Sequence, residues 1–95
     1  MICNPEDDIK NLHIRMQILE ALDGCKGYPL RQNILFNQLN ISLEGIIDTS
    51  SFESHLEYLR SKGLIDYDTP PEGGPRRWQI TEQGKRVYRD WQYNS

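Results

Sequence analysis

The sequence predicts one small α+β domain that is mainly helical and has a β-hairpin before its last helix. Three observations lead to this prediction. The chain has 95 residues, 37% of them hydrophobic, which suits one compact core rather than several domains. In four segments the apolar residues recur at spacings of three and four, as on the buried face of an amphipathic helix. Two short segments instead alternate apolar and polar residues, as strands do, and a stretch rich in proline and glycine lies between them.

A long first helix is expected from about residue 5. Asn4 is a candidate N-cap, Pro5 suits the first helical position, and the acidic residues that follow favour the positive end of the helix dipole. The helix is expected to end at Asp23-Gly24, because glycine commonly follows the last helical turn. Its apolar stripe consists of Ile9, Leu12, Met16, Leu19 and Leu22, with Ile14 and Ile18 beside it.

A loop and a shorter helix are expected next. Two glycines and a proline punctuate residues 23–29, where Tyr28 is a candidate for a very short extended piece. A helix over about residues 30–39 follows, because its apolar residues fall on one side. Residues 40–48 fit no regular pattern and are expected to be irregular. The apolar side of this second helix consists of Leu30, Ile34, Leu35 and Leu39.

The third helix has the clearest start signal. Ser50 to Glu53 match a capping box, in which a serine hydroxyl caps the backbone while Glu53 reaches back to it. Gly63 is expected to end the helix, which is therefore predicted over residues 50–62. Its apolar stripe is Phe52, Leu56 and Leu59.

Two strands and a last helix complete the predicted domain. Residues 64–68 and 77–80 are expected to pair as a two-stranded hairpin, or as part of a three-stranded sheet, with a long tip rich in turn residues. Thr81 is placed to cap a helix from Glu82 to about Trp91.

One domain over residues 1–95 is expected, with a core over about 9–91 and a frayed tail at 92–95. The predicted core residues are Leu12, Met16, Leu19, Ile34, Leu39, Phe52, Leu56, Leu59, Leu64, Trp78 and Ile80.

The order of these elements and two local strings resemble a known type of domain. The strings are Phe52-x-x-x-Leu56-x-x-Leu59-x-x-x-Gly63-Leu64-Ile65 and Ile80-Thr81-x-x-Gly84. Over about residues 9–90 the chain is similar to winged helix-turn-helix domains of the MarR, PadR and ArsR kind. In size, and in the stretch from Leu19 to Tyr28, it also resembles small winged-helix proteins encoded in Mu-like phage genomes. The resemblance implies a transcriptional regulator whose third helix enters the DNA major groove.

The resemblance assigns DNA contacts to residues 50–62 and to the wing, residues 69–77. Polar side chains on the outer face of the third helix can donate to phosphates or base edges. Two arginines follow a Gly-Gly-Pro tip on the wing, and guanidinium groups suit phosphate oxygens. Glu57 would oppose binding near a phosphate. The candidate DNA-binding residues are Ser51, Ser54, His55, Tyr58, Arg60, Lys62, Arg76 and Arg77.

The charge distribution leaves two kinds of partner open. The formal net charge is −3, but residues 1–59 have a balance of −5 and residues 60–95 a balance of +2, so a nucleic-acid surface would belong to the second half. A continuous basic band there favours double-stranded DNA as the partner. A band interrupted by acidic residues favours a winged-helix module that binds another protein instead. The band would consist of Arg60, Lys62, Arg76 and Arg77.

Aromatic residues in the last helix serve either the core of one chain or a contact between two chains. The resemblance favours a homodimer, because terminal helices commonly form the dimer in winged-helix families. The candidate interface residues are Tyr88, Trp91 and Tyr93.

Other classes of function find no support in the sequence. GxSxG, P-loop and HExxH motifs are absent, so an enzyme is not expected. Cys3 and Cys25 form no CxxC, and His13 and His55 have no ligand spacing, so neither a metal nor another cofactor is expected. No apolar run approaches the roughly 20 residues of a membrane span, and the acidic N-terminus is unlike a signal peptide. A cytoplasmic protein is therefore expected.

Overall fold

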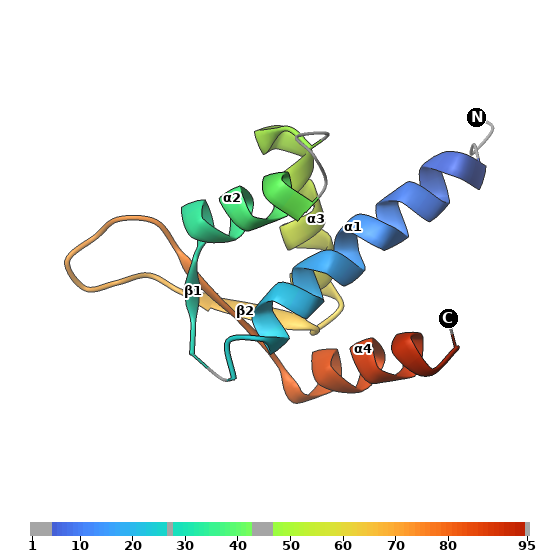
Figure 1. The fold of residues 1–95 in the computed structure, drawn as a ribbon. Helices are drawn as coiled ribbons and strands as arrows, with labels where there is room; N and C mark the ends of the chain where they lie inside the picture. Colours follow the sequence, from blue (N-terminus) through green and yellow to red (C-terminus); the bar gives the residue numbers. More distant parts are fainter. Residues whose placement is uncertain (1–4, 27, 43–46, 95) are drawn as a thin grey trace.

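Four helices and three short strands form the part of the chain that the structure describes. This part of the computed structural model comprises residues 5–26, 28–42 and 47–94. The elements follow one another in the predicted order (Figure 1). They are α1 (Pro5–Asp23), β1 (Leu30–Arg31), α2 (Gln32–Ser42), α3 (Thr49–Ser61), β2 (Ile65–Asp68), β3 (Arg77–Ile80) and α4 (Glu82–Asn94).

The strands form one antiparallel sheet in which β3 lies in the middle. Its order is β1-β3-β2, so the predicted hairpin of β2 and β3 gains a third strand. Trp78 of β3 is opposite both Leu30 of β1 and Tyr67 of β2. Because opposite residues in antiparallel strands share a face, these three side chains lie on the inner face of the sheet. The loop that joins β2 to β3 extends far beyond the helices as a wing (Figure 1).

The core is organised around α1, which contacts β3 and each of the other three helices. Ile18 and Leu19 of α1 are fully buried, and Trp78 is 1% exposed. The indole Nε1 of Trp78 donates a hydrogen bond of 3.0 Å to Oε1 of Gln32, and its ring lies 4.9 Å from that of Tyr67. Through this hydrogen bond, the buried Trp78 links β3 to the first residue of α2.

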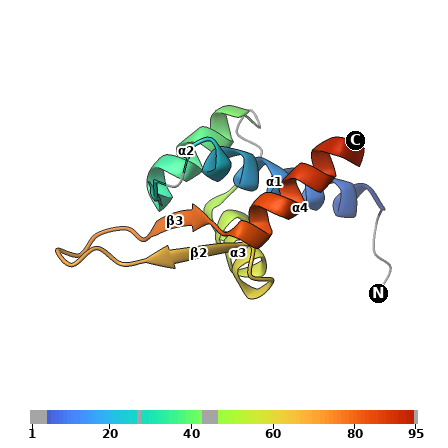
Figure 2. The same cartoon turned by 90° about the horizontal axis from the view of Figure 1, so that it is seen from below.

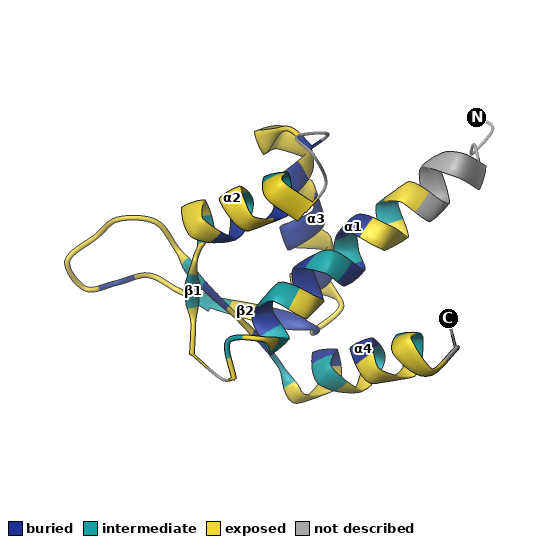
Figure 3. Cartoon of the chain, in the orientation of Figure 1, coloured by how far each residue is buried: buried dark blue, intermediate teal, exposed yellow. Residues whose placement is uncertain are grey.

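Two of the residues predicted in the core are exposed. Leu12 is 44% exposed and Ile34 is 40% exposed, whereas the other predicted core residues are buried. Leu12 lies on the amino-terminal half of α1, which projects beyond the other elements (Figures 1 and 3). On α2, Leu35 and Leu39 face the core, and Ile34 is turned away by one helical step of about 100°.

The predicted boundaries of the second helix were wrong at both ends. Leu30 and Arg31 are not helical but form β1, which pairs with β3. This strand starts two residues after Tyr28, where a short extended piece was expected. The helix begins at Gln32, whose backbone N–H donates a bond of 2.8 Å to the carbonyl of Arg76 in the wing. It continues to Ser42, into the stretch predicted to be irregular. Residues 43–46 of that stretch lie outside the described part.

The N-cap of α3 also differs from the prediction. The cap is Asp48, not a serine of the expected capping box, and its carboxylate accepts a bond of 2.7 Å from the backbone N–H of Ser51. This bond lowers the pKa of Asp48, because it stabilises the ionised carboxylate. Ser50 and Glu53 therefore lie within the helix. Gly63 follows the helix with φ of +75°, as predicted for a residue that ends a helix.

The start of α4 agrees with the prediction that Thr81 caps this helix. The Thr81 hydroxyl accepts a bond of 3.0 Å from the N–H of Gly84 and donates to the carbonyl of Gly63 at 2.7 Å. The helix runs to Asn94, beyond its predicted end near Trp91. The sequence of elements, with α2 and α3 followed by the hairpin, confirms a mainly helical winged helix-turn-helix fold.

Candidate nucleic-acid interface

The buried face of α3 contains four residues, one more than the sequence predicted. Phe52, His55, Leu56 and Leu59 are all buried, and their spacing of i, i+3, i+4 and i+7 is that of one helix face. His55 was predicted on the outer face, but it is only 7% exposed. Burial, and secondly the nearby charge of Arg15, lower its pKa, so the neutral imidazole is favoured. The buried side chain of His55 therefore cannot contact a base edge directly, contrary to the prediction.

The outward face of α3 is centred one helical step away from the predicted one. Opposite the buried face lie Ser50, Ser54, Glu57 and Ser61, all exposed. Ser54 is the one predicted contact residue among them. Tyr58 lies on the flank beside α1, with its ring under the guanidinium of Arg15. Arg60 lies on the flank beside the wing. Counting His55 in the apolar stripe would have revealed this centre from the sequence.

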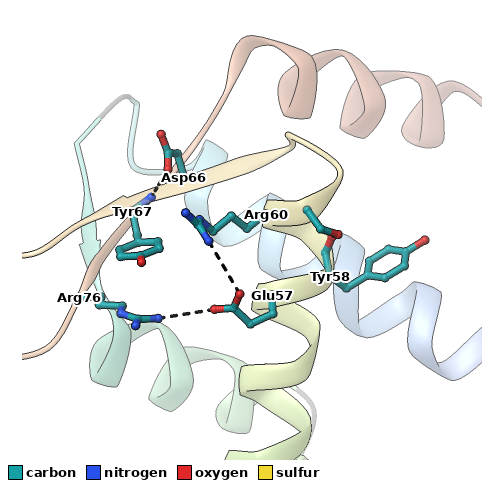
Figure 4. A network of polar contacts seen from close by, with 7 residues as sticks. Glu57, Tyr58, Arg60, Asp66, Tyr67 and Arg76 are labelled. Carbon is teal, nitrogen blue, oxygen red and sulfur yellow. Dashed lines mark hydrogen bonds and ion pairs between the residues drawn. The ribbon is translucent and has the colours of Figure 1, made fainter.

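A polar network joins α3 to the wing (Figure 4). The carboxylate of Glu57 lies 3.5 Å from Arg76 in the wing and 4.0 Å from Arg60 on its own helix. The guanidinium groups of Arg60 and Arg76 lie 4.7 and 4.4 Å from the ring centre of Tyr67. The network therefore places two predicted DNA-binding arginines beside one another, around a shared carboxylate.

Arg77 lies on the other face of the hairpin. Its register partners are Arg31 of β1 and Asp68 of β2, and these three side chains share the outer face of the sheet. The guanidinium of Arg77 binds the carboxylate of Asp68 through two nitrogens, at 2.8 and 3.3 Å. Arg31 was not among the predicted contact residues, because only the pairing of β1 with β3 brings it beside Arg77.

Acidic residues therefore interrupt the predicted basic band. Glu57 binds Arg60 and Arg76, and Asp68 binds Arg77. Lys62 is exposed at the end of α3 and lies 5.6 Å from the ring centre of Tyr58, without an ion pair to any described residue. Each paired guanidinium still has N–H groups left, since arginine has five donors and a carboxylate occupies two at most in a fork.

The predicted dimer residues of α4 have different surroundings. Tyr88 is 6% exposed and packs against the core of its own chain, and burial is the main cause of its raised pKa. Trp91 is half-buried, with its ring stacked on that of Tyr88 at 6.4 Å. Tyr93 is 93% exposed. The surface available to a second chain is therefore formed by Trp91 and Tyr93 more than by Tyr88.

Metal-binding groups are not gathered in the described part of the chain. No three side chains of the ligand types His, Cys, Asp and Glu lie together among residues 10–26, 28–42 and 47–93, whose side chains the structure describes. Cys25 is a free thiol that donates to the carbonyl of Ala21, and Cys3 lies outside the described residues. None of the helices described here is long and apolar enough to cross a bilayer.

Solved structures similar to this one are transcriptional regulators. No family model and no curated protein match the sequence. A transcriptional regulator from Clostridium thermocellum superposes with a TM-score of 0.76 at 16% identity, covering 98% of this chain and 87% of its own. A PadR-like transcription factor from Bacteroides fragilis gives 0.77 at 14% identity, covering 97% and 88%.

The PcaV transcriptional regulator from Streptomyces coelicolor, solved with its natural ligand, is similar over a smaller part of its length. Its TM-score is 0.62 at 25% identity, over 79% of this chain and 48% of that one, so this chain spans about half of that regulator. Together the likenesses confirm the predicted winged-helix fold. All three of these neighbours are transcriptional regulators.

Proposed function

We propose that this protein is a DNA-binding transcriptional regulator that places α3 in the major groove and the wing along the sugar-phosphate backbone. The single observation that supports this most is the exposed face of α3, which stands free beside a wing that holds arginines (Figures 2 and 4). An α-helix fits the major groove of B-DNA, which is about 12 Å wide. The interrupted basic band by itself favours a protein partner, but the likeness to known regulators supports DNA binding.

In this function the residues of the interface have distinct tasks. Ser51, Ser54 and Tyr58 offer hydroxyls to base edges or phosphates. Arg60 and Lys62 at the end of α3, and Arg76 and Arg77 on the wing, bind phosphates. His55 is buried and acts on DNA only through the side chains that it contacts. Glu57 and Asp68 orient the arginines, but they also reduce the attraction to a polyanion.

The first test measures binding to duplex DNA by fluorescence anisotropy at several salt concentrations. If each protomer of a dimer neutralises two to four phosphates, log K should fall against log salt with a slope of roughly −4 to −7. Replacing Arg76 and Arg77 together by glutamine should weaken binding to every sequence and flatten the slope. Absence of duplex binding by the wild type at low salt would instead favour a protein-binding module.

A variant with the opposite expected effect makes this test sharper. Glu57→Gln removes the carboxylate between Arg60 and Arg76 without changing its shape, so it should strengthen binding and steepen the salt slope. Glu20→Gln, a change of an exposed residue of α1 outside α3 and the wing, is the charge-matched control and should leave binding unchanged. Weaker binding by Glu57→Gln would mean that this carboxylate contacts a base, as an acceptor from a cytosine amino group.

A homodimer formed through the terminal helices is part of this proposal. The exposed ring of Tyr93 and the half-buried ring of Trp91 are available to a second chain, and aromatic side chains are enriched in interfaces. Sedimentation at tens of micromolar should give twice the 11.2 kDa mass of the chain. Tyr93→Ser should weaken the dimer, whereas Tyr28→Ser, a change of a loop residue that is also exposed, should not. A wild-type monomer at this concentration would contradict the dimer.

A further inference from the structure

A polar hollow of about 370 Å³ lies between α1 and α3, on the flank of α3 opposite the wing. Asn11 and Arg15 of α1 form one wall, and the first two turns of α3 form the other. The α3 wall consists of Ser50, Ser51, Ser54 and His55. The hollow therefore combines one guanidinium with several neutral groups that can donate hydrogen bonds.

Arg15 is held in a fixed orientation in this hollow. Its Nε donates a hydrogen bond of 3.2 Å to Nδ1 of His55, and its guanidinium lies 3.6 Å from the ring centre of Tyr58. Burial lowers the pKa of His55 and so favours the neutral imidazole, whose Nδ1 can accept this bond. Within the described part of the chain, the two terminal nitrogens of Arg15 have no acceptor. They can therefore donate hydrogen bonds to an acceptor from outside the chain.

The two flanks of α3 differ in their charge. On the wing flank Arg60 and Arg76 share the carboxylate of Glu57. The described residues that line the hollow include no acidic side chain. The nearby carboxylate of Asp48 is outside the lining and accepts from the backbone of Ser51. Among the described residues, Arg15 therefore has no acidic neighbour in the lining of the hollow, whereas Arg60 and Arg76 share one carboxylate.

The position of the hollow matches what a helix in the major groove requires. In Figure 2, α3 lies at the lower edge of the molecule, with the wing to its left and the amino-terminal half of α1 to its right. The major groove has a phosphate backbone on each side. A helix seated there with the wing on one backbone presents its opposite flank to the other.

Resting on the proposed function, we propose that the hollow binds a phosphate of the second DNA backbone through the terminal nitrogens of Arg15 and the hydroxyls of Ser50 and Ser54. His55 and Tyr58 are positioning residues for Arg15. The interface thereby includes the α1 side of the domain, beyond the predicted contacts of α3 and the wing. Guanidinium groups bind phosphate through two parallel N–H donors, which suits the two unpaired nitrogens.

The test compares Arg15→Gln with wild type in the same anisotropy assay on duplex DNA. One lost phosphate contact should lower the affinity roughly tenfold and flatten the salt slope by about 0.9 for each bound protomer, for all sequences alike. Arg86→Gln, an exposed change of equal charge on α4, should leave both quantities unchanged. Wild-type affinity and slope in Arg15→Gln would overturn the inference while leaving the proposed function intact, provided that wild type binds.

A second variant guards against a folding defect in Arg15→Gln. Ser54→Asp adds a negative charge to the exposed wall of the hollow and leaves the core untouched, so it should weaken binding more than Ser54→Ala does. Melting curves of all variants establish that each one is folded. If Ser54→Asp and Ser54→Ala bind equally well, no phosphate occupies the hollow and the inference fails. Failure of wild type to bind any duplex at low salt would instead remove the proposed function itself.

Discussion

Replacing Trp78 by alanine is expected to lower the free energy of unfolding by about 3–5 kcal/mol. The side chain is 1% exposed, so its removal leaves a cavity between the sheet and the start of α2. It also leaves Oε1 of Gln32 without the donor that it has now. Domains of this size have a total stability of about 5–15 kcal/mol, so the variant should be largely destabilised. Urea denaturation followed by circular dichroism measures the change.

Trp78→Phe separates the two contributions to this loss. Phenylalanine keeps most of the aromatic volume against Tyr67 but has no N–H to donate to Gln32. The expected cost is about 1–3 kcal/mol, the range for a buried polar group left without its partner, and therefore smaller than for alanine. Equal stability of the alanine variant and wild type would show that Trp78 does not join the sheet to α2 as described.

Gly84→Ala is expected to destabilise the domain by about 1–3 kcal/mol or more, although alanine has the higher helix propensity. Gly84 lies in the first turn of α4, and a Cβ there would overlap the carbonyl oxygen of Leu64 and lie 2.8 Å from Cγ1 of Ile80. The gain in propensity is only about 1 kcal/mol, and the Leu64 carbonyl belongs to backbone that cannot move aside freely. Thermal melting should therefore show a clear decrease in Tm.

The matched control is Gly24→Ala at the end of α1. A Cβ at this position would lie 3.5 Å or more from its nearest neighbours, an ordinary contact distance. This variant should melt close to wild type. If Gly84→Ala were as stable as Gly24→Ala, α4 would have to start farther from Leu64 than the structure places it.

Much of the fold follows from local patterns in the sequence. The spacing of Phe52, Leu56 and Leu59 predicted the buried face of α3, and the alternation around Trp78 predicted a strand with this residue inside. Thr81 was predicted as the cap of α4, and its hydroxyl accepts from Gly84. These predictions succeeded because each depends on residues within one or two turns of one another, where periodicity and capping act.

The candidate site was less predictable, because its residues are brought together from distant parts of the chain. His55 is 40 positions from Arg15, and nothing in the local pattern indicates that α1 covers it. Glu57 and Arg76 lie on different elements, so their ion pair, which reduces the charge of the basic band, could not be foreseen. From the sequence alone, Ser50 and Ser61 on the outward face of α3 could not be told apart from ordinary solvent-exposed residues.

The sequence by itself determined the order and approximate positions of the helices and the hairpin, since these depend on the period of apolar residues and on turn and cap residues. The tertiary structure decided which polar groups face one another. It added β1 to the hairpin, buried His55, paired Glu57 with Arg60 and Arg76, and left the terminal nitrogens of Arg15 open beside α3. The physical reason is that an ion pair or hydrogen bond depends on distances of a few ångströms between side chains, and only the packing of the helices on the sheet sets those distances.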